Sequence, residues 1–341
     1  MKNLLLTALL IGACLAFIVI RYFLVLEPAV EPLEVAPKLS QEVENAVWDW
    51  ETTEHTDPEG FLSDLHERGI TTVYADIGEY VDIYEMPYGT TKQFELDEFD
   101  SQLIEYVGFA HERGMKVHAL AGHPLWANSS HRYITEIILE YVGEFNLANP
   151  ELAFTGVQFD IEPYSQPDYS LSSAASIYIE YLDTVDQIAN QVTDLQDSDS
   201  GLATLQLGFA IPYWLDGENE YAEKVVWRGE EKFVFYHLLR RLNAVPHSYV
   251  VIMAYRNYAE GLDGVLEHTK AELKYMSTYT PRVRLFIGQE TSNVLPKKIT
   301  CYHLTFRRLK KEVDRMAELL KDQKSFSGFS FNDAATFLEL N

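Results

Sequence analysis

Short runs of apolar and β-branched residues alternate with longer amphipathic stretches from Val43 to the C-terminus. This alternation predicts βα units and a parallel sheet. The candidate strands are eight in number and cover residues 46–50, 72–77, 116–121, 156–162, 205–211, 249–255, 284–288 and 328–331. Eight such strands with helices between them predict an α/β fold, a (β/α)8 TIM barrel in a single domain.

The stretches between the strands end with recognisable helix stops. Residues 61–68 and 96–113 both run into the tetrapeptide His-Glu-Arg-Gly. We expect Gly69 and Gly114 to adopt the left-handed conformation after the last helical turn, next to basic residues that suit the helix dipole. Further helices are predicted at residues 173–193, 231–243, 264–277 and 305–323.

The N-terminal segment has a different pattern. Residues 4–20 are apolar or small, and a second apolar run follows Arg21. This length spans a bilayer, and the charges on either side place the N-terminus inside. We predict a retained signal-anchor (transmembrane helix) at residues 1–26, a proline-containing linker at 27–41 and the barrel at 42–341, outside the cytoplasm. A cleaved signal peptide and a lipoprotein modified at Cys14 are the alternatives.

Composition narrows the choice of partners. The 341 residues carry a net charge of -25, with 52 acidic and 27 basic side chains, and 47% are hydrophobic. An acidic surface repels phosphate backbones, so we expect no nucleic-acid partner. The two cysteines, Cys14 and Cys301, are too few for a disulfide framework or a cysteine-based zinc site.

The fourth candidate strand carries the main chemical signal. Residues two apart on a strand face the same side, so Gln158, Asp160 and Glu162 form one polar row. Val157, Phe159 and Ile161 form the opposite row and are expected to face the helices. Two carboxylates held side by side in a barrel repel each other and lose solvation. One of them should therefore have a raised pKa and act as a proton donor near neutral pH.

Residues 155–162 resemble the strand-four signature of glycoside hydrolase family 18, the chitinase-like enzymes, which reads Asp-Gly-x-Asp-x-Asp-x-Glu. The final Asp and Glu of the signature match Asp160 and Glu162, while Thr155 and Gln158 replace its first two Asp residues. The resemblance implies that Glu162 is the general acid/base. It also implies that Asp160 orients an acetamido group whose oxygen attacks the anomeric carbon, a substrate-assisted mechanism.

The sixth strand extends the resemblance. Residues 253–256, Met-Ala-Tyr-Arg, are similar to the Met-x-Tyr-Asp of family 18. The match implies that Tyr255 hydrogen-bonds the acetamido oxygen. Arg256 stands where the family has Asp, and this replacement and Gln158 both argue against chitin as the substrate.

The seventh strand supports an alternative mechanism. Glu290 follows the apolar run 284–288, and a Glu after strand four together with a Glu after strand seven is the pattern of the large retaining glycosidase clan. In that pattern Glu162 is the acid/base and Glu290 the nucleophile. We prefer the family-18-like mechanism because that clan has Asn before the strand-four Glu, where this chain has Ile161. Glu290 has a structural alternative, an ion pair with Arg256.

Other strand ends supply candidate substrate-binding groups, since aromatic faces stack on sugars and polar groups bind hydroxyls. Together with Gln158 and Arg256 from the motifs above, these candidates are Asp49, Trp50, Asp76, His123, Tyr213, Trp214 and Asn332. Acidic and histidine side chains at the same mouth leave a metal-dependent hydrolase as a third hypothesis. However, the first strand has no His-x-His, and the fifth and sixth end without His, so we expect no metal and no cofactor.

These patterns predict a glycosidase that hydrolyses an extracellular or envelope polysaccharide or oligosaccharide. The expected catalytic residues are Glu162, Asp160, Tyr255 and Glu290. A non-catalytic glycan-binding barrel is the alternative from another functional class, and the presence of Glu162 argues against it.

Overall fold

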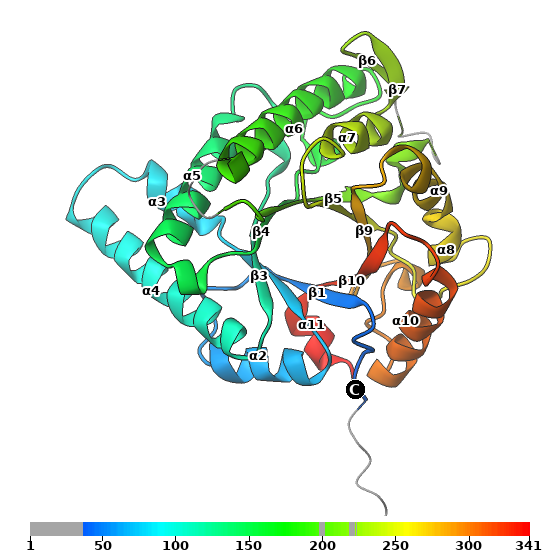
Figure 1. Cartoon of the computed structure of the whole chain (residues 1–341), viewed down its shortest axis with the longest axis horizontal. Helices are drawn as coiled ribbons and strands as arrows, with labels where there is room; N and C mark the ends of the chain where they lie inside the picture. The colour runs from blue at the N-terminus through cyan, green and yellow to red at the C-terminus, as the bar shows by residue number, and fades with distance from the viewer. Residues whose placement is uncertain (1–36, 198–201, 218–221, 223) are drawn as a thin grey trace, which may run out of the picture. The chain divides into compact units, whose positions relative to one another are not determined.

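Eight parallel strands close into a barrel in the order β1-β10-β9-β8-β5-β4-β3-β2 (Figure 1). The closed barrel confirms the predicted (β/α)8 fold, and each predicted strand overlaps an observed one. The barrel strands are β1 (Glu44–Asp49), β2 (Thr72–Asp76), β3 (Lys116–Ala121), β4 (Gly156–Phe159), β5 (Gln206–Pro212), β8 (Ser248–Met253), β9 (Arg284–Glu290) and β10 (Phe326–Asn332).

The structure, a computed structural model, describes residues 37–197, 202–217, 222 and 224–341. The predicted signal anchor and residues 27–36 of the predicted linker lie outside the described residues. None of the helices in the described ranges is both long and apolar enough to cross a membrane. The compact unit begins at Pro37 and not at residue 42. Leu39 is buried, and its N–H donates to the Arg68 carbonyl at 2.9 Å.

Helices surround the barrel on its outside (Figure 1). They are α2 (Pro58–Glu67), α3 (Glu79–Glu85), α4 (Thr90–Glu112), α5 (Tyr133–Ala148), α6 (Ala174–Asp197), α7 (Val234–Leu242), α8 (Val265–His268), α9 (Lys270–Tyr279), α10 (Phe306–Leu320) and α11 (Ala334–Glu339). Gly69 and Gly114 have φ of 98° and 70°, which confirms the predicted left-handed helix stops after α2 and α4.

Several parts of the chain differ from the sequence-based expectations. The helices α3, α5 and α11 were not predicted. The first residues of the helix predicted at 231–243 belong instead to an antiparallel hairpin of β6 (Lys224–Trp227) and β7 (Glu230–Phe233). β4 ends at Phe159 and not at residue 162, because Pro163 cannot donate a ladder hydrogen bond and begins the short helix η3 (Pro163–Ser165).

The alternation predicted for β4 is confirmed. Val157, Phe159 and Ile161 are buried in the core that the barrel shares with the helices. Gln158 lies inside the barrel, where its Oε1 accepts from Trp48 Nε1 and its Nε2 donates to the Tyr249 hydroxyl at 3.2 Å. Tyr249 OH also lies 2.7 Å from His118 Nδ1. Both polar atoms of the Gln158 amide therefore have a hydrogen-bond partner within the barrel interior.

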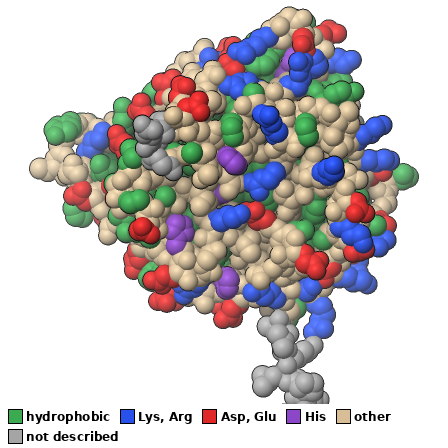
Figure 2. All heavy atoms as spheres, viewed as in Figure 1, with side chains coloured by type: hydrophobic (Ala, Val, Ile, Leu, Met, Phe, Trp, Pro, Cys, Tyr) green, Lys and Arg blue, Asp and Glu red, His purple; other side chains and the backbone are tan. Residues whose placement is uncertain are grey.

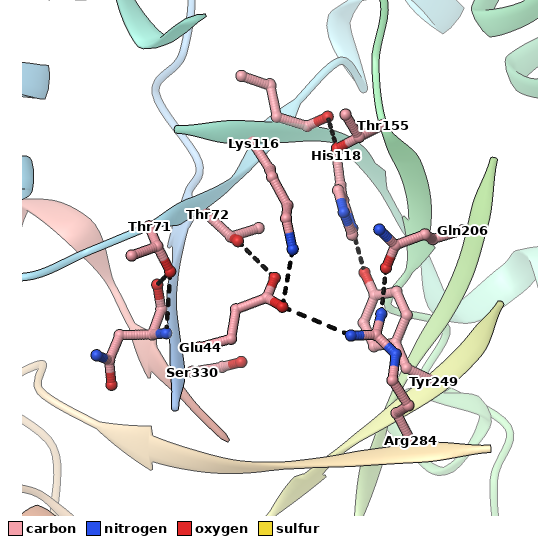
Figure 3. Close-up of polar contacts among 12 residues, drawn as sticks. Glu44, Thr71, Thr72, Lys116, His118, Thr155, Gln206, Tyr249, Arg284 and Ser330 are labelled. Atoms are coloured by element: carbon pink, nitrogen blue, oxygen red, sulfur yellow. Dashed lines mark hydrogen bonds and ion pairs between the residues drawn. The ribbon is translucent and has the colours of Figure 1, made fainter. Parts of the chain in front are cut away.

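A polar cluster lies at the N-terminal ends of the strands (Figure 3). Glu44 accepts from the Thr72 hydroxyl at 2.6 Å and from Lys116 Nζ at 3.0 Å, and Arg284 lies 3.5 Å away. Burial acts to raise the pKa of Glu44, but Thr72, Lys116 and Arg284 together hold it below its ordinary value. Ion pairs thus connect the N-terminal ends of the strands to one another. The candidate site lies at the opposite end of the barrel.

Candidate active site

A cavity of about 630 Å³ lies beyond the carboxyl ends of β4, β5 and β8. This is the end at which barrel enzymes place their active sites. Its lining is mostly aromatic and apolar, with one carboxylate and one guanidinium. The lining residues are Glu162, Tyr164, Tyr169, Pro212, Tyr213, Trp214, Met253, Tyr255, Arg256 and Ile299.

Glu162 is the one acidic side chain that lines this cavity. The Tyr164 hydroxyl donates to its Oε1, and the Ser165 hydroxyl lies 3.4 Å from its Oε2. Tyr164 in turn packs its ring at an edge against Trp214, with 4.8 Å between centroids. The turn at Pro163 thus brings a tyrosine back onto the carboxylate, so Glu162 is held in place while remaining accessible from the cavity.

Asp160 lies behind Glu162, where β4 leaves the sheet. Its Oδ1 is buried and has no hydrogen-bond partner among the described residues. Burial raises the pKa of Asp160 to about 8, and the negative charge of Glu162 adds to the rise. Asp160 therefore carries a proton at neutral pH. This agrees with the prediction that one of the paired carboxyls has a raised pKa, and it identifies that carboxyl as Asp160.

Gly122, directly after β3, allows the backbone of Asp160 to approach closely. A Cβ at position 122 would lie 2.0 Å from the Asp160 carbonyl oxygen. The Asp160 N–H donates to the Ala121 carbonyl at 3.1 Å, which fixes the chain just before Glu162. A residue larger than glycine at 122 would displace the backbone that carries both carboxyls.

The Tyr255 hydroxyl has a pKa that is affected by three carboxyls. Burial raises the pKa of its hydroxyl well above the ordinary value, and the charges of Glu290, Asp160 and Glu162 raise it further. The hydroxyl therefore stays protonated at any physiological pH. Because Tyr255 also lines the cavity, it can donate a hydrogen bond to a bound ligand.

Glu290 ends β9, and its side chain is almost fully buried. Its Oε1 accepts from the Ser292 N–H at 2.6 Å and its Oε2 from Asn332 Nδ2 at 2.9 Å. Burial raises the pKa of Glu290, and these hydrogen bonds act in the opposite direction. The charge of Glu290 raises the pKa of the Tyr255 hydroxyl, but Glu290 is not among the residues that line the cavity.

Arg256 lines the cavity but does not pair with Glu290, contrary to the alternative considered from the sequence. Its Nη2 lies 2.7 Å from Asp263 Oδ1. Asp263 also accepts from Lys298 Nζ at 2.6 Å and lies 3.0 Å from His268 Nε2. No sequence pattern indicated Asp263, because its partners Arg256, His268 and Lys298 lie on separate segments. Hydrogen bonds from Arg256 and Lys298 hold the pKa of Asp263 well below its ordinary value.

Of the predicted binding residues, Tyr213, Trp214 and Arg256 line the cavity. Asp49 does not, contrary to the expectation, because its carboxylate faces outward and accepts from Tyr106 OH at 2.6 Å and His55 Nε2 at 2.8 Å. Gln158 is likewise outside the cavity, enclosed in the barrel interior.

The remaining predicted binding residues surround the cavity or lie away from it. Trp50 and Asp76 line a separate depression of about 340 Å³ above β1 and β2. His123 is exposed and caps the short helix η1 (Pro124–Ala127). Asn332 connects Trp50 to Glu290, since it accepts from Trp50 Nε1 at 2.9 Å.

Several site residues were missed from the sequence. Tyr164 and Tyr169 follow β4 in the loop 163–172, and Ile299 follows β9. Tyr181 on α6 is buried, and the charges of Asp160 and Glu162 add to the effect of burial in raising the pKa of its hydroxyl. Only Tyr164 had a usable signal, its place two residues after Glu162 in a proline turn.

Within the described parts of the chain, no three or more His, Cys, Asp or Glu side chains are arranged to hold a metal ion. The metal-dependent hydrolase hypothesis therefore has no ligand set among these residues to which it can be assigned.

Comparison with known proteins gives the fold. The sequence matches no protein-family model, and no curated protein matches it. A family 18 chitinase from Pseudoalteromonas aurantia has a TM-score of 0.50 and 11% identity over 86% of this chain and 94% of that chain. A family 5 glycoside hydrolase from Prevotella bryantii has a TM-score of 0.51 and 12% identity, over 89% and 98% of the two chains.

An exo-β-1,4-mannosidase from an Opitutaceae bacterium has a TM-score of 0.54 and 10% identity. The match covers 85% of this chain and 52% of the mannosidase, so this chain corresponds to about half of that protein. All three similar structures are glycoside hydrolases with barrels. At such identities the similarity establishes the barrel fold and leaves the reaction to be argued from the site.

Proposed function

We propose that this protein is a retaining glycoside hydrolase that cleaves an N-acetylated saccharide of an extracellular or envelope polysaccharide, with Glu162 as general acid/base. The single observation that carries the proposal is that Glu162 faces an aromatic-lined cavity two residues after Asp160, whose buried Oδ1 has no hydrogen-bond partner among the described residues. Glycosidases require a proton donor and a second group that stabilises positive charge at the anomeric carbon.

The proposed first step is substrate-assisted. Glu162 gives a proton to the glycosidic oxygen while the acetamido oxygen of the substrate attacks the anomeric carbon. The bond to the leaving sugar breaks, and an oxazolinium ion forms within the substrate. In the second step Glu162, now a carboxylate, removes a proton from water as that water attacks the anomeric carbon, and the bond between the acetamido oxygen and that carbon breaks. Two inversions give net retention.

Asp160 and Tyr255 assist these steps in the proposed mechanism. The proton on Asp160 can pass to Glu162, which makes Glu162 ready to donate it to the glycosidic oxygen. Asp160, now a carboxylate, accepts a hydrogen bond from the acetamido N–H and so polarises the acetamido group. Tyr255, held protonated by its surroundings, donates to the acetamido oxygen. The orphaned Asp160 Oδ1 fits this role, because a buried acceptor without a partner is costly unless a ligand satisfies it.

A second mechanism is supported by the environment of Tyr255. Among the charged groups, Glu290 contributes most to the raised pKa of Tyr255, a residue that lines the cavity. In this mechanism Glu162 remains the acid/base and Glu290 attacks the anomeric carbon itself, which forms a covalent glycosyl-enzyme intermediate.

Two measurements separate the mechanisms. Residues 37–341 are purified and assayed on N-acetylated and neutral oligosaccharides, beside the Glu162→Gln, Asp160→Asn and Glu290→Gln variants. The proposal predicts cleavage of N-acetylated substrates only, loss of activity in Glu162→Gln and Asp160→Asn, and no sugar adduct on the protein by mass spectrometry. Cleavage of neutral glycans with an adduct on Glu290 would establish the second mechanism. Binding of oligosaccharides without any hydrolysis would make the chain a glycan-binding barrel.

The membrane anchor at residues 1–26 remains part of the proposal. It would hold the barrel at the outer surface of the membrane, where polysaccharides are found. Fractionation of cells that express the full chain, followed by N-terminal sequencing of the barrel, distinguishes a retained anchor from a cleaved signal peptide.

A further inference from the structure

The chain is divided into an acidic part and a basic part. Residues 37–223 contain 6 Lys and Arg and 36 Asp and Glu, which gives a net charge of -30. Residues 224–341 contain 19 Lys and Arg and 13 Asp and Glu, which gives +6. In Figure 2 the Lys and Arg side chains gather over the upper and right-hand parts, where β6, β7 and α7 to α10 lie in Figure 1.

The cavity lies at the boundary between these two parts. Glu162, Tyr164 and Tyr169 come from the acidic part, whereas Met253, Tyr255, Arg256 and Ile299 come from the basic part. The two walls of the cavity therefore differ in charge. Glu162 is the carboxylate on one wall, and Arg256 is the guanidinium on the other.

Two lysines directly precede Ile299, which lines the cavity with Arg256, although neither lysine is itself a lining residue. Lys297 and Lys298 belong to the short helix η5 (Lys297–Ile299), whose last residue lines the cavity. η5 is held against the chain that follows Arg256, because Asn257 N–H donates to the Lys298 carbonyl at 3.0 Å and Asn257 Nδ2 to the Lys297 carbonyl at 2.8 Å. These two hydrogen bonds hold the backbone of Lys297 and Lys298 beside Asn257, the residue that follows Arg256.

The positive charge of this wall is only partly compensated. Asp263 is the carboxylate that pairs with both Arg256 and Lys298, and it also meets His268. The exposed Lys297 ammonium makes no ion pair with a described residue. Arg256 and Lys298 therefore share one carboxylate and Lys297 has none, so these three permanent cations exceed their paired carboxylates by about two charges.

We infer that the cavity takes an acidic saccharide, in which an anionic group on the sugar next to the cleaved linkage binds the wall formed by Arg256, Lys297 and Lys298. An anion on that wall is kept away from Glu162 and gains charge-assisted hydrogen bonds. The net negative charge of the whole chain does not prevent this, since distant charges are screened beyond about 8 Å at physiological salt. Arg256 also reverses the charge of the Asp that family 18 has at this position.

The inference rests on the proposed glycosidase function and names its substrate class. Carboxylates and sulfates both provide the required anion, and two matched substrates distinguish them. The first is an oligosaccharide in which N-acetylhexosamine alternates with hexuronic acid, compared with its carboxyl-reduced, neutral form. The second is a sulfated N-acetylhexosamine oligosaccharide compared with its desulfated form.

The test measures binding by calorimetry with the Glu162→Gln variant, so that turnover does not interfere. We expect at least one acidic oligosaccharide to bind about 10-fold more tightly than its neutral form at low salt, which corresponds to one or two favourable contacts with a charged group. The preference should shrink several-fold in 0.5 M NaCl. Adding Lys297→Gln and Lys298→Gln should reduce it, whereas Lys270→Gln and Lys274→Gln, the same charge change on α9 away from the cavity, should not.

Each failure has a separate meaning. Equal binding of the acidic and neutral forms, or a preference that survives loss of Lys297 and Lys298 unchanged, overturns the inference. Glu162-dependent cleavage of neutral N-acetylated oligosaccharides together with equal binding leaves the proposed hydrolase standing without an acidic substrate. Lysine-dependent binding of the acidic form without cleavage by the wild-type protein supports the inference and overturns the proposed reaction.

Discussion

The Tyr164 hydroxyl donates a hydrogen bond to Glu162 Oε1 from only two residues further along the chain. Pro163 between them begins a short helix, and the Tyr164 ring rests against Trp214 in the cavity wall. The turn at Pro163 therefore brings the tyrosine onto the acid/base, and Trp214 supports that tyrosine. The relationship also gives Trp214 a second role, since the ring that faces the ligand supports the tyrosine that holds Glu162.

Replacing Tyr164 with Phe should lower kcat by about 10- to 100-fold, because a hydrogen bond to a charged group contributes about 1.5–3 kcal/mol. KM should change little, since the cavity wall keeps its aromatic ring. Steady-state kinetics on a cleaved oligosaccharide measure both. Tyr133→Phe is the control, because Tyr133 makes the same kind of bond to Glu85 at 3.0 Å on the surface. Equal kcat values for the Tyr164→Phe variant and wild type would remove Tyr164 from the account.

Asp160→Asn should make stability less dependent on pH. The raised pKa means that folded wild type binds this proton more tightly than the unfolded chain does. The wild type should therefore lose stability as pH rises from about 4, the unfolded pKa, to about 8, the folded pKa. The Asn variant keeps no such dependence, so its advantage should grow over this range by at least about 1.4 kcal/mol, the equivalent of one pKa unit.

Thermal melts from pH 4 to pH 9 measure this difference, with the exposed Asp97→Asn variant as the control. An advantage of Asp160→Asn that stays constant across the range would show that Asp160 is ionised throughout in the folded protein.

Gly122→Ala should impair the site more than the fold elsewhere. The added Cβ would meet the Asp160 carbonyl oxygen at 2.0 Å, so the end of β4 must move. We expect a loss of about 2–4 kcal/mol in stability and a fall in kcat of at least about 10-fold. Gly108→Ala on α4 is the matched control, since its Cβ would meet Leu152 at an ordinary 4.0 Å. Similar kcat values for the two variants would mean that the backbone beside Gly122 does not position the carboxyls.

Gln158→Leu should affect stability and not catalysis. The substitution leaves the Trp48 N–H without its acceptor and the Tyr249 hydroxyl without one donor, at a cost of about 1–3 kcal/mol for each buried group. Urea denaturation measures this loss of stability. The kcat of the folded variant should stay within about 3-fold of wild type, because Gln158 does not line the cavity. A large fall in kcat at unchanged stability would restore Gln158 to the list of substrate-binding residues.

The pattern of apolar residues was sufficient to predict the barrel, because every barrel strand must bury a row of outward-facing side chains against the helices. The alternation in β4 correctly placed Gln158 inside and Phe159 outside. The same rule excludes Asp49 from the cavity once Trp48 is known to face inward. The expectation for Asp49 was wrong because it followed the strand end alone and ignored the alternation.

The partners of the loop residues could not be predicted from the sequence. Asp263 comes seven residues after Arg256, but its contacts with His268 and Lys298 depend on how three loops fold together. The burial of Asp160, which sets its pKa, likewise depends on the close approach of Gly122 from a neighbouring strand. The local sequence pattern identified Asp160, but its pKa and the ion pairs of Asp263 depend on tertiary contacts.

The most direct test of the central claim is the rate of hydrolysis of an N-acetylated oligosaccharide by wild type and by Glu162→Gln. Wild type should cleave the oligosaccharide measurably with retention at the anomeric carbon. The variant should lose at least about 1,000-fold in kcat, since the substitution removes the proton donor of the first step. Circular dichroism should show both proteins equally folded. Cleavage by Glu162→Gln at the wild-type rate would contradict the assignment of Glu162 as the acid/base.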